Sequence, residues 1–193
     1  FFFKQKTAYE MTSSLGGLGD VYKRQLYYST YLTIKKDVMM IVTSSAIKNG
    51  YFDDKYGKRG NDTEKKVPLL SFPFEIAEEP EGTVSYAWIL EDEDAVPVAG
   101  FSWIHWMAAN VRKKFIPEDF SRQNKNVIQG ENSWGLIGYG GMTPPNTTHR
   151  YDLHVYALDT TLELQQGFSI EDLYRAMGEH ILDSFTLSGK YTC

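Results

Sequence analysis

The chain has 193 residues, of which 42% are hydrophobic and 15% aromatic, and its formal net charge at pH 7 is -5. This composition supports a packed interior and argues against a general nucleic-acid binder, which would need a basic surface. The single cysteine, Cys193, excludes an intrachain disulfide and a cysteine-based metal site, and no apolar run approaches membrane-spanning length, so we predict a soluble cytoplasmic protein without a membrane span.

The N-terminal stretch contains a partial glycine motif. The sequence "LGGLGDVYKRQ", residues 15–25, matches the second half of a protein-kinase glycine loop, including Gly16 and Gly19. The sequence lacks V-A-I-K, D-F-G and A-P-E, and "HRYD" at 149–152 has Tyr151 where the catalytic-loop aspartate would stand. A partial glycine motif alone is weak evidence, and a kinase is not expected.

A second interpretation of the N-terminal stretch covers more residues. The sequences "FFFKQKTAYE" and "DVYKRQ" resemble translated sequencing adaptor, which would make residues 1–25 foreign to the natural protein. Lys36 and Asp37 can be encoded by a ribosome-binding sequence just upstream of Met39 and Met40. We therefore expect residues 1–39 to be a non-native, disordered leader and residues 40–193 to form one domain. A genuine N-terminal arm is the alternative.

Three segments in the middle of the chain predict a β scaffold. Residues 42–67, which come first, are polar and are expected to be a surface meander with one or two short strands. "TVSYAWILED" (83–92) alternates, with both faces mostly apolar, as in a strand covered on both sides. "FSWIHWMAANV" (101–111) and "RYDLHVYALD" (150–159) are strands of the same kind.

One helix is predicted near the C-terminus. Ser169 can cap it, and Asp172 stands three residues later, as in a capping box. Apolar residues at helical spacing form one stripe: Leu173, Ala176, Met177, Ile181. The closing strand "SFTLSGKY" (184–191) follows, so the whole pattern predicts a mainly β domain with peripheral helices.

Two of the four histidines lie in unusual surroundings. His105 lies in a strand between two tryptophans, where a buried ring needs a partner; a core histidine bonded to the backbone is the simpler interpretation. His149 follows a long glycine- and proline-rich loop, and strand periodicity places it on one face with Tyr151. These two side chains and the loop amides could surround a small cavity, or His149 could merely be solvated at the strand end.

The other charged features have ordinary explanations. We expect His154 to be exposed or lightly paired, and His180 to be a charge partner at the helix end. The acidic run "EDED" (91–94) is typical of a solvated turn. Because it follows a buried strand, one of its carboxylates could turn inward and fix the tautomer of a histidine.

Three sequences in this order carry a family resemblance: "LEDEDAVPVAGFSWIHW", "GYGGMTPPNTTHRYDLHVYALD" and "GEHILDSFTLSGKY". Together they resemble the bacterial branch of the phosphatidylethanolamine-binding protein family, which includes the Raf kinase inhibitor proteins. The resemblance spans about residues 41 to 191. It implies a β-sandwich of antiparallel sheets with peripheral helices and an anion pocket at one end.

The resemblance also implies which residues form that pocket. Carried over position by position, they are Asp92, His105, Gly138, Gly140, Gly141, Pro144, His149 and Tyr151. The sequence departs from the family pattern at Glu93, where a proline is usual, and at Met142, so we expect the rim of the pocket to differ in shape from that of the family. Asp92 is expected to accept a hydrogen bond from a histidine and to orient that ring as a donor.

The expected function is binding of a small anion, such as phosphate or a phosphorylated head group, without a cofactor. Anion affinity is expected to rise as the pH falls through the histidine range. A protein-interaction inhibitor of a kinase or protease is the alternative, and exposed aromatic residues could form a homodimer face. A metal-dependent hydrolase using Asp92, His105 and His149 as ligands is a third interpretation, but no nucleophile motif supports an enzyme.

Overall fold

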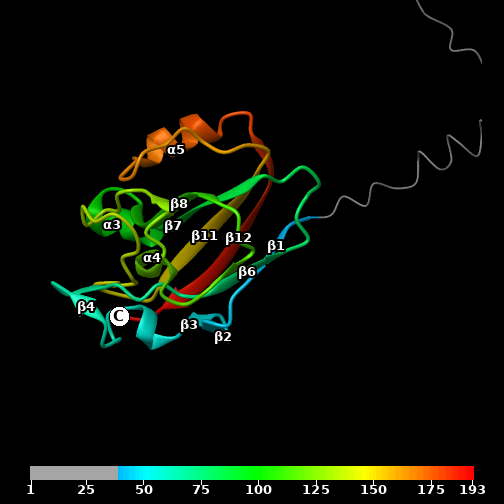
Figure 1. The fold of residues 1–193 in the computed structure, drawn as a ribbon. Helices are drawn as coiled ribbons and strands as arrows, with labels where there is room; N and C mark the ends of the chain where they lie inside the picture. The colour runs from blue at the N-terminus through cyan, green and yellow to red at the C-terminus, as the bar shows by residue number, and fades with distance from the viewer. Residues whose placement is uncertain (1–38) are drawn as a thin grey trace, which may run out of the picture. The chain divides into compact units, whose positions relative to one another are not determined.

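The computed structural model describes residues 39–193, and Figure 1 shows how their strands and helices are arranged. The glycine motif and residues 1–38 of the predicted leader, which spans residues 1–39, lie outside the described residues. In the described part long strands dominate and the helices are short, which confirms the prediction of a mainly β fold.

The largest sheet has seven strands in the order β10-β8-β7-β11-β12-β3-β2. In chain order they are β2 (Ile47–Lys48), β3 (Tyr51–Phe52), β7 (Ser85–Asp92), β8 (Trp103–Val111), β10 (Ile128–Gln129), β11 (His149–Leu158) and β12 (Ile181–Tyr191). Neighbours are antiparallel except β12 and β3, which pair in parallel through Lys190 and Tyr51. The resemblance implies antiparallel sheets, so this one parallel pair differs from the expectation. In the β2–β3 hairpin, the strand that lies next to β12 is β3, and β3 runs in the same direction as β12.

Two smaller sheets complete the β structure. A three-stranded sheet has the order β1-β6-β9, and a two-stranded sheet pairs β4 with β5. Their strands are β1 (Ile41–Thr43), β4 (Thr63–Glu64), β5 (Val67–Pro68), β6 (Phe74–Ala77) and β9 (Phe115–Ile116). The three-stranded sheet shares one hydrophobic core with the seven-stranded sheet, as the two layers of a sandwich do.

The central strands β7 and β8 are covered on both faces, as their apolar pattern predicts. On one face Tyr86 and Trp88 are buried in the shared core, where the Trp88 ring lies 5.2 Å from that of Phe74 in β6. On the other face Ala87 and Ile89 belong to a second apolar cluster beneath helix α5 (Ile170–Met177). Strands buried in this way form the rigid framework on which the site is built.

Helix α5 (Ile170–Met177) begins with the predicted capping box. The Asp172 N–H donates to Ser169 Oγ at 3.1 Å, and the Ser169 N–H donates to the Asp172 carboxylate at 3.2 Å. Leu173 and Met177 are fully buried against the sheet, which confirms that these two residues belong to the apolar stripe.

The apolar stripe ends one turn earlier than the sequence predicts. Gly178 takes a positive φ of 34° directly after Met177, and the helix does not continue beyond it. Ile181, expected on the helix, instead begins β12 with 41% of its surface exposed.

The other helices within residues 39–193 are single turns. They are η1 (Asp54–Tyr56), η2 (Glu93–Ala95), α3 (Val96–Ala99) and α4 (Phe120–Gln123). Among residues 39–193 we find no helix with the length and apolar character that crossing a membrane requires.

Candidate functional site

Three polar side chains from adjacent strands meet at one end of the large sheet. Asp92 ends β7, whereas His105 lies near the start of β8 and Tyr151 near the start of β11. Because both neighbours of β7 are antiparallel to it, their starts lie beside its end. Strand periodicity places His149 and Tyr151 on the same inward face, and both are buried.

An irregularity in the pairing of β7 with β8 directs His105 toward this group. The register shifts between Leu90, opposite Trp106, and Glu91, opposite Ile104. Strict alternation would put His105 and Trp106 on opposite faces, but at the irregularity both are buried on the side of the shared core. The sequence offers no signal for this shift.

The three side chains line a cavity of about 400 Å³. The residues of the described part that line it are Asp92, Ala95, Val98, Ala99, Trp103, His105, Trp134, Thr143, Pro145 and Tyr151. The apolar residues of this lining outnumber the polar ones, and the set contains no lysine or arginine. Trp103 and Trp134, which sequence reasoning missed, form an aromatic wall with ring centroids 5.3 Å apart.

His105 is both a backbone-bonded core residue and part of the cavity wall. Its Nδ1 lies 2.8 Å from the Gly140 carbonyl oxygen, which can only accept, so Nδ1 carries the proton. Burial lowers the pKa of His105 to about 4. The ring is therefore neutral at neutral pH and does not titrate in the range on which the expected pH dependence relies.

Asp92 turns inward, as one carboxylate of the acidic run was expected to do. The His149 Nδ1–H donates to Asp92 Oδ2 at 2.7 Å, and the Ala95 N–H donates to Oδ1 at 3.1 Å. Burial raises the pKa of Asp92, while the hydrogen bond from His149 opposes that rise. The carboxylate thus orients the imidazole, which agrees with the expected role.

His149 and Pro144 do not line the cavity, although both were expected to. His149 lies behind Asp92, and its Nε2 is 2.9 Å from Asn146 Oδ1, so both ring nitrogens already face an oxygen. Pro144 is buried, with its carbonyl accepting a hydrogen bond from Lys58 at 2.6 Å, and Pro145 lines the cavity in its place.

Gly138, Gly140 and Gly141 also lie outside the cavity lining. Each of them packs so closely against a neighbour that a side chain would not fit. A Cβ on Gly140 would lie 2.6 Å from the Trp134 ring, and one on Gly138 would lie 2.6 Å from Ser121 Oγ. One on Gly141 would lie 2.3 Å from a backbone oxygen. Gly140 nevertheless acts on the site through the carbonyl that holds His105.

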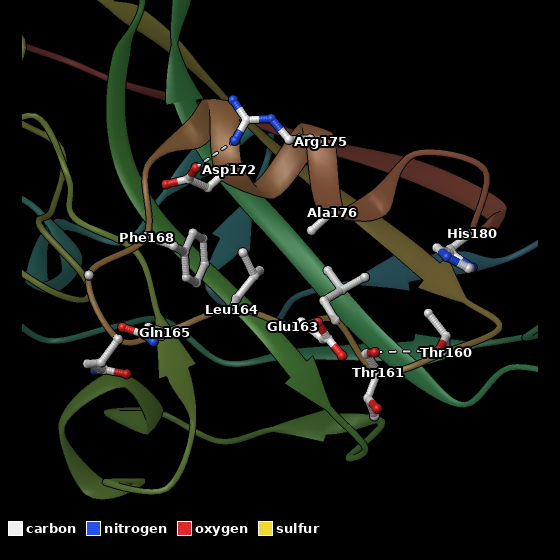
Figure 2. Close-up of a pocket in the computed structure, with 13 residues that line it drawn as sticks. Thr160, Thr161, Glu163, Leu164, Gln165, Phe168, Asp172, Arg175, Ala176 and His180 are labelled. Atoms are coloured by element: carbon white, nitrogen blue, oxygen red, sulfur yellow. Dashed lines mark hydrogen bonds and ion pairs between the residues drawn. The ribbon is translucent and has the colours of Figure 1, made fainter.

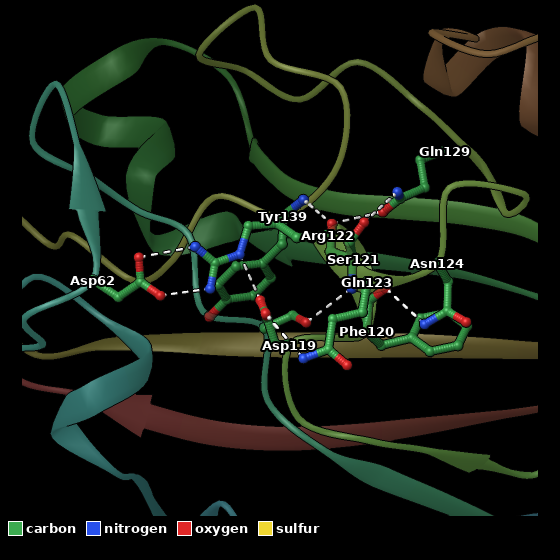
Figure 3. A network of polar contacts seen from close by, with 10 residues as sticks. Asp62, Asp119, Phe120, Ser121, Arg122, Gln123, Asn124, Gln129 and Tyr139 are labelled. Carbon is green, nitrogen blue, oxygen red and sulfur yellow. Dashed lines mark hydrogen bonds and ion pairs between the residues drawn. The ribbon is translucent and has the colours of Figure 1, made fainter.

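A buried polar network contacts the glycine loop, and Figure 3 labels three of its residues, Ser121, Gln129 and Tyr139. Gln129 Oε1 accepts hydrogen bonds from Trp106 Nε1 at 2.9 Å and from Ser121 Oγ at 2.7 Å. Ser121 Oγ in turn accepts the Tyr139 N–H at 2.9 Å. Because every one of these contacts is buried, the loop is held in a defined position beside the cavity.

Two donors at the cavity wall have no partner. The Tyr151 hydroxyl and the Trp103 Nε1–H are buried and make no hydrogen bond within residues 39–193. Burial, and after it the nearby Asp92 carboxylate, raises the pKa of Tyr151, so the hydroxyl keeps its proton. An unsatisfied buried donor is costly, and here both belong to residues that line one cavity.

The interpretation as a metal site is not supported by the geometry. In the described part of the chain, no group of three His, Cys, Asp or Glu side chains is placed to hold a metal ion. Asp92 and His149 pair with each other, and His105 binds a carbonyl. These three side chains therefore do not form the two-histidine, one-carboxylate set.

The other two histidines lie away from the cavity. On the opposite face of the sheet, His154 Nε2 lies 3.0 Å from Glu91 Oε1 and its Nδ1 lies 2.9 Å from Thr186 Oγ1. His180 follows α5 and pairs with Asp159 through Nδ1 at 2.8 Å. Both histidines are paired. His154 was expected to be exposed or lightly paired, and His180 was expected to be a charge partner at the helix end; the partner of His180, Asp159, lies outside the helix.

A larger cavity, of about 750 Å³, lies between α5 and residues 160–168 (Figure 2). Three of the charged or titratable side chains in its lining are paired, Asp172 with Arg175 at 3.2 Å and His180 with Asp159, whereas Glu163 makes no ion pair within residues 39–193. Within residues 39–193, no residue with an unsatisfied buried donor lines this larger cavity. The smaller cavity is therefore the better candidate site.

Comparison with known proteins places the chain in a family. The phosphatidylethanolamine-binding protein family matches residues 42–192. This chain belongs to that family. The protein YxkA of Bacillus subtilis (strain 168) is 43% identical over 150 residues, covering 69% of this chain and 89% of YxkA. A UPF0098 protein of Pyrococcus horikoshii is 34% identical over 165 residues, covering 81% of this chain and 78% of that protein.

Solved structures of phosphatidylethanolamine-binding protein relatives share the fold. A homologue from Chlamydia trachomatis superimposes with a TM-score of 0.68 at 31% identity, covering 80% of this chain and 97% of that one. Escherichia coli YbcL, described as a member of the mammalian family, gives a TM-score of 0.69 at 25% identity, with coverage of 80% and 98%. The mainly β sandwich is therefore the family's fold.

Proposed function

We propose that this phosphatidylethanolamine-binding protein family member binds a small anion, such as phosphate or a phosphorylated head group, in the cavity beside Asp92. The observation that carries the proposal is the pair of unsatisfied donors, the Tyr151 hydroxyl and Trp103 Nε1–H. Ligand oxygens placed between them would accept both hydrogen bonds and remove the cost of leaving them unmade. Membership of the phosphatidylethanolamine-binding protein family supports an anion-binding site in this protein.

The carboxylate of Asp92 does not prevent anion binding. Both of its oxygens already accept a hydrogen bond, one from His149 and one from the Ala95 N–H. Burial also raises its pKa, which disfavours the charged form. The proposed ligand thus meets a partly compensated carboxylate.

A protein-interaction role at the cavity mouth is the second candidate. Val96, Val98 and Phe101 are 45%, 53% and 50% exposed, and Val98 lines the cavity. Apolar side chains exposed together are typical of contact surfaces. We also propose that the protein is regulatory, has no enzymatic activity and is located in the cytoplasm.

Calorimetric titration of the full chain with phosphate and with phosphorylethanolamine tests the proposal. The variant Tyr151→Phe should weaken binding at least about tenfold, because it removes one donor to a charged ligand. Tyr174→Phe, at a 49% exposed tyrosine that does not line the cavity, is the matched control and should bind normally. Absence of binding to the folded wild-type protein would overturn the proposal.

A further inference from the structure

The polar wall of the cavity offers hydrogen-bond acceptors as well as donors. Because the proton of His105 is on Nδ1 and bonded to Gly140, Nε2 keeps a lone pair. This second nitrogen has no partner among the described residues, and the ring lines the cavity. Asp92, on the same wall, also has only lone pairs to offer when it is ionised.

The hydrogen bond to Gly140 fixes this polarity. The other neutral tautomer would set a nitrogen lone pair against the carbonyl lone pairs at 2.8 Å. The protonated ring is disfavoured by burial. The titratable groups around His105 are Asp92 from β7 and Tyr151 and His149 from β11. None of the described residues that line the cavity is a lysine or an arginine.

A fully ionised anion can therefore accept hydrogen bonds from the donors of the cavity wall but has no hydrogen to donate to its acceptors. Its oxygens could accept from Tyr151 and Trp103, but they would meet the lone pair of His105 Nε2 without a proton between them. An oxyacid that keeps one acidic hydrogen can accept from the two donors and donate to the acceptor. The apolar remainder of the lining leaves room for an organic substituent on the acid.

On the basis of the proposed function, we propose that His105 makes this pocket selective for oxyacids that retain one hydrogen, with phosphate monoesters bound as their monoanions in preference to sulfate monoesters. His105 is then the specificity-determining residue, acting as an acceptor. Tyr151 and Trp103 supply the affinity that all oxyanions share.

Titration of the full chain with phenyl phosphate and phenyl sulfate at pH 5.0 tests this selectivity. The second pKa of a phosphate monoester is about 6, so at this pH both esters are mainly monoanions of similar shape. Only the phosphate ester has a hydrogen to donate. We expect phenyl phosphate to bind at least about tenfold more tightly. Equal affinities would overturn the inference, whereas no binding of either ester would overturn the proposed function itself.

Two variants separate the acceptor from the donors. His105→Phe should reduce the affinity for phenyl phosphate to that for phenyl sulfate. Tyr151→Phe should weaken both esters and leave their ratio unchanged. If the ratio survives in His105→Phe, the inference is wrong.

A change of pH keeps the test decisive if His105→Phe does not fold. Raising the pH of the wild-type protein to 8 converts phenyl phosphate to its dianion and leaves the charge of phenyl sulfate unchanged. Binding of phenyl phosphate should fall at least about tenfold relative to phenyl sulfate. A constant or rising ratio would contradict the inference, and phenyl sulfate corrects for any titration of the protein.

Discussion

At the scale of single residues, His154 connects three strands on the face of the large sheet opposite Tyr151. Its ring contacts Thr186 of β12 and Glu91 of β7 at 2.9 Å and 3.0 Å. The hydrogen bond with Glu91 raises the pKa of His154, and the same contact lowers the pKa of Glu91. The pair therefore stabilises the fold over a limited pH range.

We predict that His154→Gln destabilises the protein most at about pH 5.5. Because the pKa of His154 is raised in the folded state, the pair stabilises the fold fully below the unfolded histidine pKa of about 6.5, and this stability is lost as the pH rises through the folded pKa. Because the pKa of Glu91 is lowered in the folded state, its contribution is present above about pH 4.5 and is lost as the pH falls. Solvent screening limits the effect to roughly 1 kcal/mol, and it should shrink by pH 8.5. Urea unfolding at both pH values measures it.

His180→Gln is the matched control for this prediction. The side chains of His180 and its partner Asp159 are 49% and 47% exposed, and exposed pairs contribute little. An effect of His154→Gln that does not change with pH would show that packing, and not the charge pair, is responsible.

The shared face of His149 and Tyr151 could be predicted from strand periodicity. The acidic run allowed one carboxylate to turn inward, but only the family resemblance singles out Asp92. The polarity of His105 could not be predicted. It depends on a register irregularity and on a carbonyl 35 residues further along the chain. Likewise, the glycines of the loop match the expected positions, but their role in packing depends on Trp134 and Ser121, which meet them only in the fold.

At the scale of elements, α5 shows how local sequence determines a boundary. The capping box at Ser169 is a short-range pattern and was correctly predicted at the start of the helix. The end of the helix was not, because Leu173, Met177 and Ile181 share a spacing that suits a longer helix. Gly178 ends the helix before that spacing is used.

We predict that Ser169→Ala lowers the free energy of unfolding by about 1 kcal/mol, the usual cost of removing an N-cap side chain. The matched control is Ser184→Ala on β12, an exposed serine that caps nothing, where the change should stay within about 0.5 kcal/mol. Urea denaturation of both variants measures the difference. Similar losses in the two variants would argue against a stabilising cap.

At the scale of the whole molecule, binding at the proposed site should stabilise the entire domain. A ligand at about 100 times its dissociation constant adds about 2.7 kcal/mol to the folded state. For a protein of this size we predict that the midpoint of thermal unfolding rises by roughly 5–10 °C in phosphate. Sodium chloride at equal ionic strength is the control, and the same shift in Tyr151→Phe would show that the ion acts elsewhere.

The parallel contact between Tyr51 and Lys190 has a consequence for the order of assembly. A ribosome releases the β2–β3 hairpin early, but its place in the large sheet exists only after β12 has been made and has paired with β11. Such distant pairing slows folding, because a long loop must close before the contact forms. The β2–β3 hairpin therefore joins the sheet only after β12, the last strand of the chain, has paired. At this edge the strands that are synthesised first pair last.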